Sequence, residues 1–277
     1  MDPEILNQVA ERIVDDIHND PHQFQPLRRR EFWSRSEGWP DRLKNYQWPT
    51  GTEFRPASAN AEAISERVLS FVKSYQENPT KLTDADFANI AKAVFNWGGV
   101  GKNSDKNHQL GAQARAVIES ALAGERLNSA PMSSSWTKLA AFASHGQEIP
   151  HPQIIFDSRV ANSLATRLER LASDLNPTIL AQFRDELGYI SGRGGSRKSE
   201  KIKQIRSQQG WRIHRYDEAA TKRWWKAHFL AGELVQKMRV SLNQNFAHFG
   251  HMPSWKDDGA GEWTTRGVEM VLFMDGY

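Results

Sequence analysis

The stretches SSWTKLA at residues 134–140 and QIIFDSRV at residues 153–160 contain the two residues on which the functional prediction depends, Lys138 and Asp157. Lys138 lies near the start of a predicted short helix, where the helix dipole, partial burial and an aromatic neighbour all favour a neutral amine. Asp157 ends an apolar run and precedes another predicted helix, so its carboxylate is placed to cap backbone amides and stay ionised. Together they predict an amine nucleophile beside an anion. Taken singly, a surface lysine and a plain N-cap are the more ordinary interpretations.

Around these stretches the sequence predicts helices. Apolar residues recur at helical spacing in most of the chain, and helix-capping residues such as Thr83, Asp84 and Asp157 mark starts. The predicted helices cover 4–18, 59–75, 84–97, 112–122, 136–143, a segment from 158, 177–187 and 217–246. Residues 25–58, rich in proline and tryptophan, are predicted to lie irregularly over a core, and 266–273 to form a strand.

The predicted fold class is therefore mainly α, with two helical lobes, a cleft between them and a minor β element near the C-terminus. Residues 1–277 are expected to form a single domain. Its possible lobes are residues 1–95 with 172–277, and residues 96–171.

Composition removes several classes of protein. The 277 residues include no cysteine, which excludes disulfides, thiolate nucleophiles and cysteine-ligated clusters. No run approaches the roughly 20 apolar residues of a membrane span, and the opening MDPE is acidic where a secretory signal would be basic. We expect a cytoplasmic protein without a membrane partner.

Positive charge is concentrated locally. Residues 192–215 include eight basic side chains and a single acidic one, Glu200, although the net charge of the whole chain is only +3. Three of the ten tryptophans lie in or near this stretch, a mixture that suits a phosphate backbone and exposed bases. A solvated loop followed by an amphipathic core helix fits the charges equally well. The candidate DNA-binding residues here are Arg193, Arg197, Lys198, Lys201 and Lys203.

Two other motifs are weaker. The loop Trp97-Gly98-Gly99-Val100-Gly101-Lys102 lacks the spacing and the Ser or Thr of a Walker loop, and a helix end is the favoured interpretation. His248 and His251 flank a glycine with no carboxylate close by, so no metal site is predicted.

Lys138, Asp157, the apolar residues before Asp157 and the separation of 157 − 138 = 19 positions resemble the catalytic region of the helix-hairpin-helix DNA glycosylases, in particular the 8-oxoguanine glycosylase (OGG) fold. The resemblance implies a catalytic pair, Lys138 and Asp157, and needs no cofactor. The family's glycine-rich hairpin is replaced here by Ala130-Pro131-Met132-Ser133-Ser134-Ser135. In place of close amide contacts, the hydroxyls of Ser133, Ser134 and Ser135 are expected to contact phosphate.

The resemblance further implies a bacterial cytoplasmic monomer that acts on double-stranded DNA carrying a modified base. The base would be flipped out of the helix and its N-glycosidic bond cleaved, leaving an abasic site, with strand nicking by β-elimination as an optional step. The favoured substrate is a modified pyrimidine of phage DNA, such as glucosylated hydroxymethylcytosine, in anti-phage defence; 8-oxoguanine repair is the alternative. The expected base pocket is Trp97, Trp136, Phe156 and Trp225, with Arg159 on phosphate or supporting the site.

Two other classes of function remain open. A non-catalytic DNA-binding or sensing protein of the same fold would bind DNA in a salt-dependent way and release no base. Alternatively, the basic stretch serves an RNA or protein partner, in which case RNA would bind more tightly than DNA.

Overall fold

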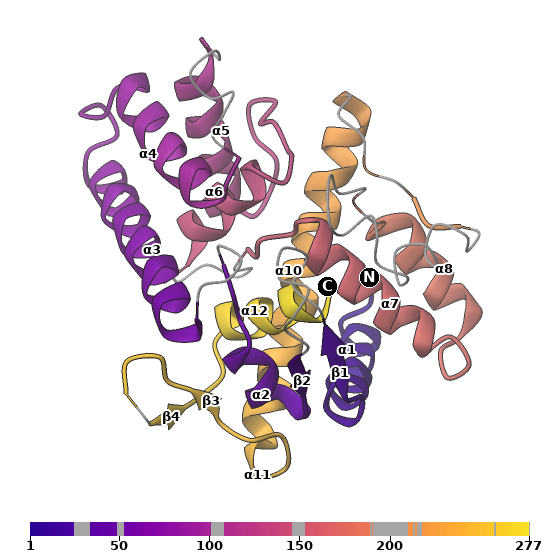
Figure 1. Cartoon of the computed structure of the whole chain (residues 1–277). Coiled ribbons are helices and arrows are strands. Elements are labelled where there is room, and N and C mark those ends of the chain that lie inside the picture. The colour runs from indigo at the N-terminus through magenta and orange to yellow at the C-terminus, as the bar shows by residue number, and fades with distance from the viewer. Residues whose placement is uncertain are drawn as a thin grey trace.

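The computed structural model describes residues 1–24, 34–48, 53–100, 108–145, 153–188, 190, 210–212, 214, 218–257 and 259–276. These residues form a mainly helical structure (Figure 1). The helices are α1 (Pro3–Asn19), α2 (Gly38–Lys44), α3 (Phe54–Glu77), α4 (Asp84–Trp97), α5 (Leu110–Ala123), α6 (Trp136–Ser144), α7 (Ser158–Arg170), α8 (Pro177–Glu186), α10 (Glu218–Gln244), α11 (Phe246–Phe249) and α12 (Thr265–Asp275).

The strands are short and pair antiparallel. Strand β1 (His22–Phe24) pairs with β2 (Ser34–Ser36), and β3 (Met252–Pro253) with β4 (Ala260–Gly261). The second pair is a small β element near the C-terminus, as predicted. No helix in the described ranges is long and apolar enough to cross a bilayer.

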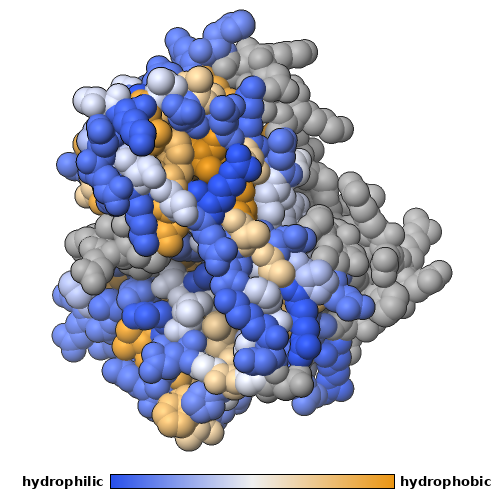
Figure 2. All heavy atoms as spheres, turned by 90° about the vertical axis from the view of Figure 1, so that its left-hand side faces the viewer, coloured by the Kyte–Doolittle hydropathy of each residue, from blue (hydrophilic) through white to orange (hydrophobic). Residues whose placement is uncertain are grey.

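Helices α3, α4, α5 and α6 pack on one another and form the upper left part of Figure 1. Helix α4 starts where predicted because Thr83 and Asp86 form a capping box, each side chain accepting the other's backbone N–H. It ends at Trp97, followed by Gly98 and by Gly99 at φ +66°, which confirms the helix-end interpretation of this glycine pair. Figure 2 shows the side of the molecule that carries α3, where hydrophilic side chains predominate and hydrophobic ones gather in the upper part.

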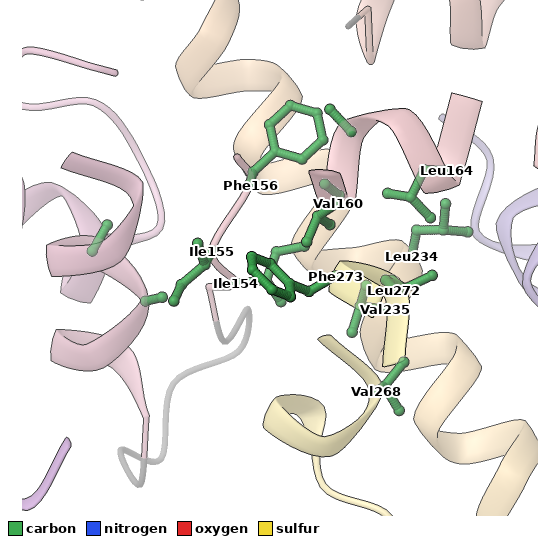
Figure 3. Packing of buried hydrophobic residues seen from close by; sticks show 14 of the residues in the cluster. Ile154, Ile155, Phe156, Val160, Leu164, Leu234, Val235, Val268, Leu272 and Phe273 are labelled. Carbon is green, nitrogen blue, oxygen red and sulfur yellow. The ribbon is translucent and has the colours of Figure 1, made fainter. Parts of the chain in front are cut away.

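The long helix α10 is the centre of the remaining helices. It contacts α1, α8 and α12, while α12 also contacts α2 and α7. Figure 3 shows how the extended run Ile154–Phe156 enters the core, with α7, α10 and α12 contributing the surrounding side chains. Because this run is almost fully buried, it fixes where Asp157, the next residue, is placed.

The predicted strand at 266–273 is wrong, because these residues lie in helix α12. The hydroxyl of Thr264 accepts the Gly267 N–H and starts the helix. Val268, Met270, Val271, Leu272, Phe273 and Met274 are all buried, since the helix packs against several others. Residues 270–274 are apolar at every position and therefore reveal no period, and Val268 and Val271 suggested a strand.

The segment 25–58 also differs from expectation. It contains α2, in which Trp39 is fully buried and donates its indole N–H to the Val14 carbonyl over 3.0 Å. Helix α3 begins at Phe54 rather than near residue 59, because Pro56 falls in its first turn, where no backbone donor is needed. The other predicted helices form, with ends shifted by a few residues.

A buried ion network joins α1, α2, α7 and α12. The Asp275 carboxylate accepts from Arg42 Nη1 at 2.7 Å, from Arg167 Nε at 3.0 Å and from Ser163 Oγ at 2.6 Å. The side chains of Arg42, Arg167 and Asp275 have no exposed surface. Arg167 Nη1 reaches out to Asp16 at 2.7 Å. This network holds the C-terminal end of α12 against the helices that surround it.

Candidate active site

Lys138 and Asp157 lie together, as the resemblance implied. The Lys138 Nζ is 4.0 Å from Asp157 Oδ2, and each residue is only 5% exposed. Lys138 is in the first turn of α6, while Asp157 is the N-cap of α7 and its Oδ1 accepts the Arg159 N–H at 2.9 Å and the Val160 N–H at 3.3 Å. The cap leaves Oδ2 free to face the amine.

The Lys138 amine is held in one place. Its Nζ donates to the Ser134 carbonyl at 2.7 Å, and its aliphatic chain passes over Gly98 so closely that a Cβ there would come 2.6 Å from Lys138 Cδ. Burial lowers the pKa of the Lys138 amine, Asp157 opposes this, and the cations Arg159 and Arg266 add to the lowering. A lysine buried to this degree is rare without a role.

The pair lines a small cavity of about 10 Å³. That volume is close to the smallest that holds one water molecule, so the cavity as it stands admits no nucleobase. Its lining consists of Tyr46, Trp48, Trp97, Lys138, Ile155, Asp157, Arg266, Glu269 and Phe273.

Helix α12 contributes two charged residues that the sequence analysis missed. Arg266 Nη1 forms an ion pair with Glu269 Oε1, and Glu269 Oε2 accepts the Ile155 N–H at 2.8 Å. Glu269 is 2% exposed. Helical spacing of i and i+3 in 265–275 was the signal that could have placed them on one face, but the segment was interpreted as a strand.

A second, larger cavity of about 600 Å³ lies on the other side of Arg266. It falls within the range of about 300–1,000 Å³ typical of small-molecule sites. Four polar atoms of residues that line this cavity are buried without a hydrogen-bond partner among the described residues: Ser58 Oγ, His145 Nε2, Arg239 Nε and Arg266 Nε. Its lining comes mainly from α3, the end of α6, α10, α12 and the β3 region: Leu43, Phe54, Ser58, Ala61, Glu62, Ser65, Phe142, Ser144, His145, Gln236, Arg239, Met252, Pro253, Trp255, Thr264, Thr265, Arg266, Gly267 and Met270.

His145 faces this larger cavity in its neutral form. Burial of the ring, assisted by the nearby Arg266 cation, lowers the pKa of His145 to about 3. A neutral imidazole at physiological pH both donates and accepts hydrogen bonds, so this side chain suits recognition of a polar ligand better than attraction of an anion.

Of the four predicted base-pocket residues, only Trp97 lines the cavity of Lys138 and Asp157. Trp136 packs its ring against Phe95, with ring centroids 4.9 Å apart. Phe156 is fully buried in the core. Within the described part of the chain, neither Trp136 nor Phe156 lines the small cavity or the larger one.

Trp225 is also fully buried, and it holds the connection between α5 and α6. Its Nε1 donates to the Ala130 carbonyl at 3.0 Å, and Arg126 Nε donates to the same oxygen at 2.9 Å. Arg126 Nη1 in turn pairs with Glu218 of α10 at 2.7 Å. Trp225 thus fixes the residues that lead into Ser133–Ser135 and α6.

The predicted DNA-binding residues fall into two groups. Ser133, Ser134 and Ser135 precede α6 and are partly exposed. The Arg159 guanidinium lies over the rings of Phe273 and Trp48, 4.8 and 5.5 Å from their centroids. Arg193, Arg197, Lys198, Lys201 and Lys203 lie outside the described residues, as does Lys102.

The histidine pair shows no metal-binding arrangement in the described part of the chain. His248 packs on His18, with ring centroids 4.7 Å apart, while His251 stacks on Phe246. Among the residues that the structure describes, no group of three or more His, Asp or Glu side chains is arranged to hold a metal ion.

Comparisons of the chain with protein-family models, with curated proteins and with solved structures gave no significant match.

Proposed function

We propose that this protein is a DNA glycosylase with Lys138 as nucleophile and Asp157 as its electrostatic and base partner. The observation that carries the proposal is the buried pair itself, an amine and a carboxylate 4.0 Å apart at the starts of α6 and α7. Placing an ammonium and a carboxylate out of water is costly. A buried amine of lowered pKa that lines a cavity beside a carboxylate is typical of catalytic sites.

In the proposed reaction, the neutral Lys138 amine attacks the anomeric carbon of an extruded nucleotide. The carbon–nitrogen bond to the base breaks, and its electron pair leaves with the base, which takes up a proton. Asp157 stabilises the positive charge that develops on the sugar and accepts a proton from the attacking amine. The C1′–O4′ bond of the resulting aminal then opens as O4′ takes up a proton, and a Schiff base forms. Water hydrolyses the Schiff base, which regenerates the amine and leaves an abasic site.

The larger cavity is the better candidate for holding the extruded base. The small cavity is too narrow for a base, whereas the larger one adjoins it and is lined by ring systems and unpartnered polar atoms. In this proposal the helices α3–α6 and those around α10 act as two lobes with the base between them. The hydroxyls of Ser133, Ser134 and Ser135 and the basic residues between 192 and 215 contact the DNA backbone.

The favoured substrate is a modified pyrimidine of phage DNA, such as glucosylated hydroxymethylcytosine, excised in anti-phage defence in the bacterial cytoplasm. A cavity of about 600 Å³ is of the size that accommodates ligands larger than a plain base. Repair of 8-oxoguanine is the alternative. The two are distinguished by which DNA yields abasic sites.

The variant Asp157→Asn tests the role of the carboxylate. Asparagine is an equally good N-cap, so α7 should start normally. The negative charge is lost, and we expect base release to slow at least about 100-fold. Base release at the wild-type rate in a folded Asp157→Asn protein would contradict this assignment.

A test of the lysine geometry comes from Gly98→Ala. The backbone of Gly98 is right-handed, at φ −74°, so alanine is tolerated there, but its Cβ would lie 2.6 Å from Lys138 Cδ. We expect the lysine chain to be displaced and base release to fall at least about tenfold, because small misplacements of reacting groups are costly.

The control for this variant is Gly261→Ala, since a Cβ at Gly261 meets nothing within 4 Å. The rates of single-turnover base release should differ between the two alanine variants. Equal rates would mean that the contact between Gly98 and Lys138 does not matter for the reaction.

A further inference from the structure

Arg266 lies at the boundary between the two cavities. It is the one residue, among those described, that appears in the lining of both. Its guanidinium lies over two aromatic rings, with Cζ 5.6 Å from the centroid of Trp97 and 5.4 Å from that of Phe142. One ring faces the small cavity and the other faces the large one, so the cation separates the Lys138 amine from the space on the other side.

The position of Arg266 is fixed by its partners. It pairs with Glu269 one turn further along α12, and its Nη2 donates to the Tyr46 hydroxyl at 3.4 Å. The second oxygen of Glu269 accepts the backbone N–H of Ile155, two residues before Asp157. The Arg266–Glu269 ion pair therefore links the Arg266 guanidinium to the segment that precedes Asp157.

We infer that Arg266 is a positioning residue for Lys138: it lies at the boundary between the amine and the large cavity and places a fixed positive charge beside the amine. The part of this inference that concerns catalysis rests on the proposed function. The effect of the Arg266 charge on the Lys138 amine does not, and it can be measured on the protein without DNA.

The charges around Lys138 determine whether loss of the Arg266 charge raises or lowers the pKa of the Lys138 amine. Burial lowers the pKa of Lys138 most, Asp157 raises it, and Arg159 and Arg266 lower it further. Among the described residues, the charged and titratable groups near the amine come from three parts of the chain: Asp157 and Arg159 at the start of α7, Arg266 and Glu269 on α12, and Tyr46 after α2. The end of α4 contributes only the uncharged Trp97 and Gly98. Removing the Arg266 charge leaves the attraction to Asp157 less opposed, so the Lys138 pKa must rise.

The test is an NMR titration of protein labelled with ¹³C-lysine, in which the Lys138 Cε signal is identified by its absence in Lys138→Gln. We expect Arg266→Gln to move the Lys138 titration midpoint upward by at least about half a pH unit. Arg266→Lys, which keeps the charge, should leave the midpoint close to that of the wild type. Gly261→Ala, whose added Cβ would meet nothing within 4 Å, should leave the Lys138 midpoint unchanged.

An upward shift in Arg266→Gln that is absent in Arg266→Lys would support the inference. An unchanged midpoint in Arg266→Gln would overturn it. If Arg266→Gln does not fold, Arg266→Met provides the second uncharged variant, and an unchanged midpoint there overturns the inference equally. The proposed function is tested separately, because absence of base release by the wild type would remove the glycosylase while leaving these shifts to be observed.

Discussion

Replacement of Lys138 by glutamine is expected to abolish base release, by a factor of at least about 1,000, while DNA binding is retained. Glutamine fills similar space and can still donate to the Ser134 carbonyl, which the Lys138 amine contacts at 2.7 Å, but it has no nucleophilic nitrogen. Loss of a group that forms the covalent intermediate removes most of the catalysis. The measurement is single-turnover formation of abasic sites, with DNA binding followed in parallel.

The matched control is Lys73→Gln, at an exposed position on α3. Lys73→Gln makes the same replacement away from the site, so it shows what the loss of an exposed lysine does to DNA binding and base release. Only Lys138→Gln should lose base release. A Lys138→Gln protein that still releases base at the wild-type rate would make Lys138 a structural lysine.

The largest effect on stability is expected from Asp275→Asn. The carboxylate neutralises Arg42 and Arg167, all three side chains are fully buried, and no water can replace the lost charge. Removing one partner of a buried ion network typically costs about 3–5 kcal/mol. For a chain of this size we expect the thermal unfolding midpoint to fall by about 10 °C.

Glu37→Gln provides the comparison. It breaks the ion pair with Arg35, whose N–O distance is 2.9 Å but whose side chains are 61% and 66% exposed. Exposed pairs of this kind contribute at most about 1 kcal/mol, so the midpoint should hardly move. Equal midpoints for the Asp275→Asn and Glu37→Gln proteins would show that the buried network does not hold α12 in place.

The sequence predicted most helices because their signals are local. The Thr83–Asp86 capping box, the glycines after Trp97 and the Asp157 N-cap each act within a few residues. The pairing of Lys138 and Asp157 was expected only from the family resemblance, because no local signal joins two residues 19 positions apart. The structure shows the two side chains to be close.

The remainder of the site depends on contacts between distant segments, which one sequence does not reveal. Arg266 and Glu269 reach the lysine only because α12 is a helix that packs on α2, α7 and α10. Because residues 270–274 are apolar at every position, the sequence shows no helical period there, and this helix was predicted as a strand. Trp225 was chosen as a base contact for its aromatic ring, but its indole N–H is committed to Ala130.

A covalent reaction of Lys138 with DNA is tested by trapping the Schiff base. Purified protein is incubated with plain DNA and with DNA that contains uracil, 8-oxoguanine opposite cytosine, hydroxymethylcytosine or its glucosylated form. Borohydride is present or absent, and abasic sites and trapped protein–DNA adducts are scored. The account predicts abasic sites and a trapped adduct on one modified DNA, both missing with Lys138→Gln. DNA binding without abasic sites or an adduct on any of these substrates would contradict it.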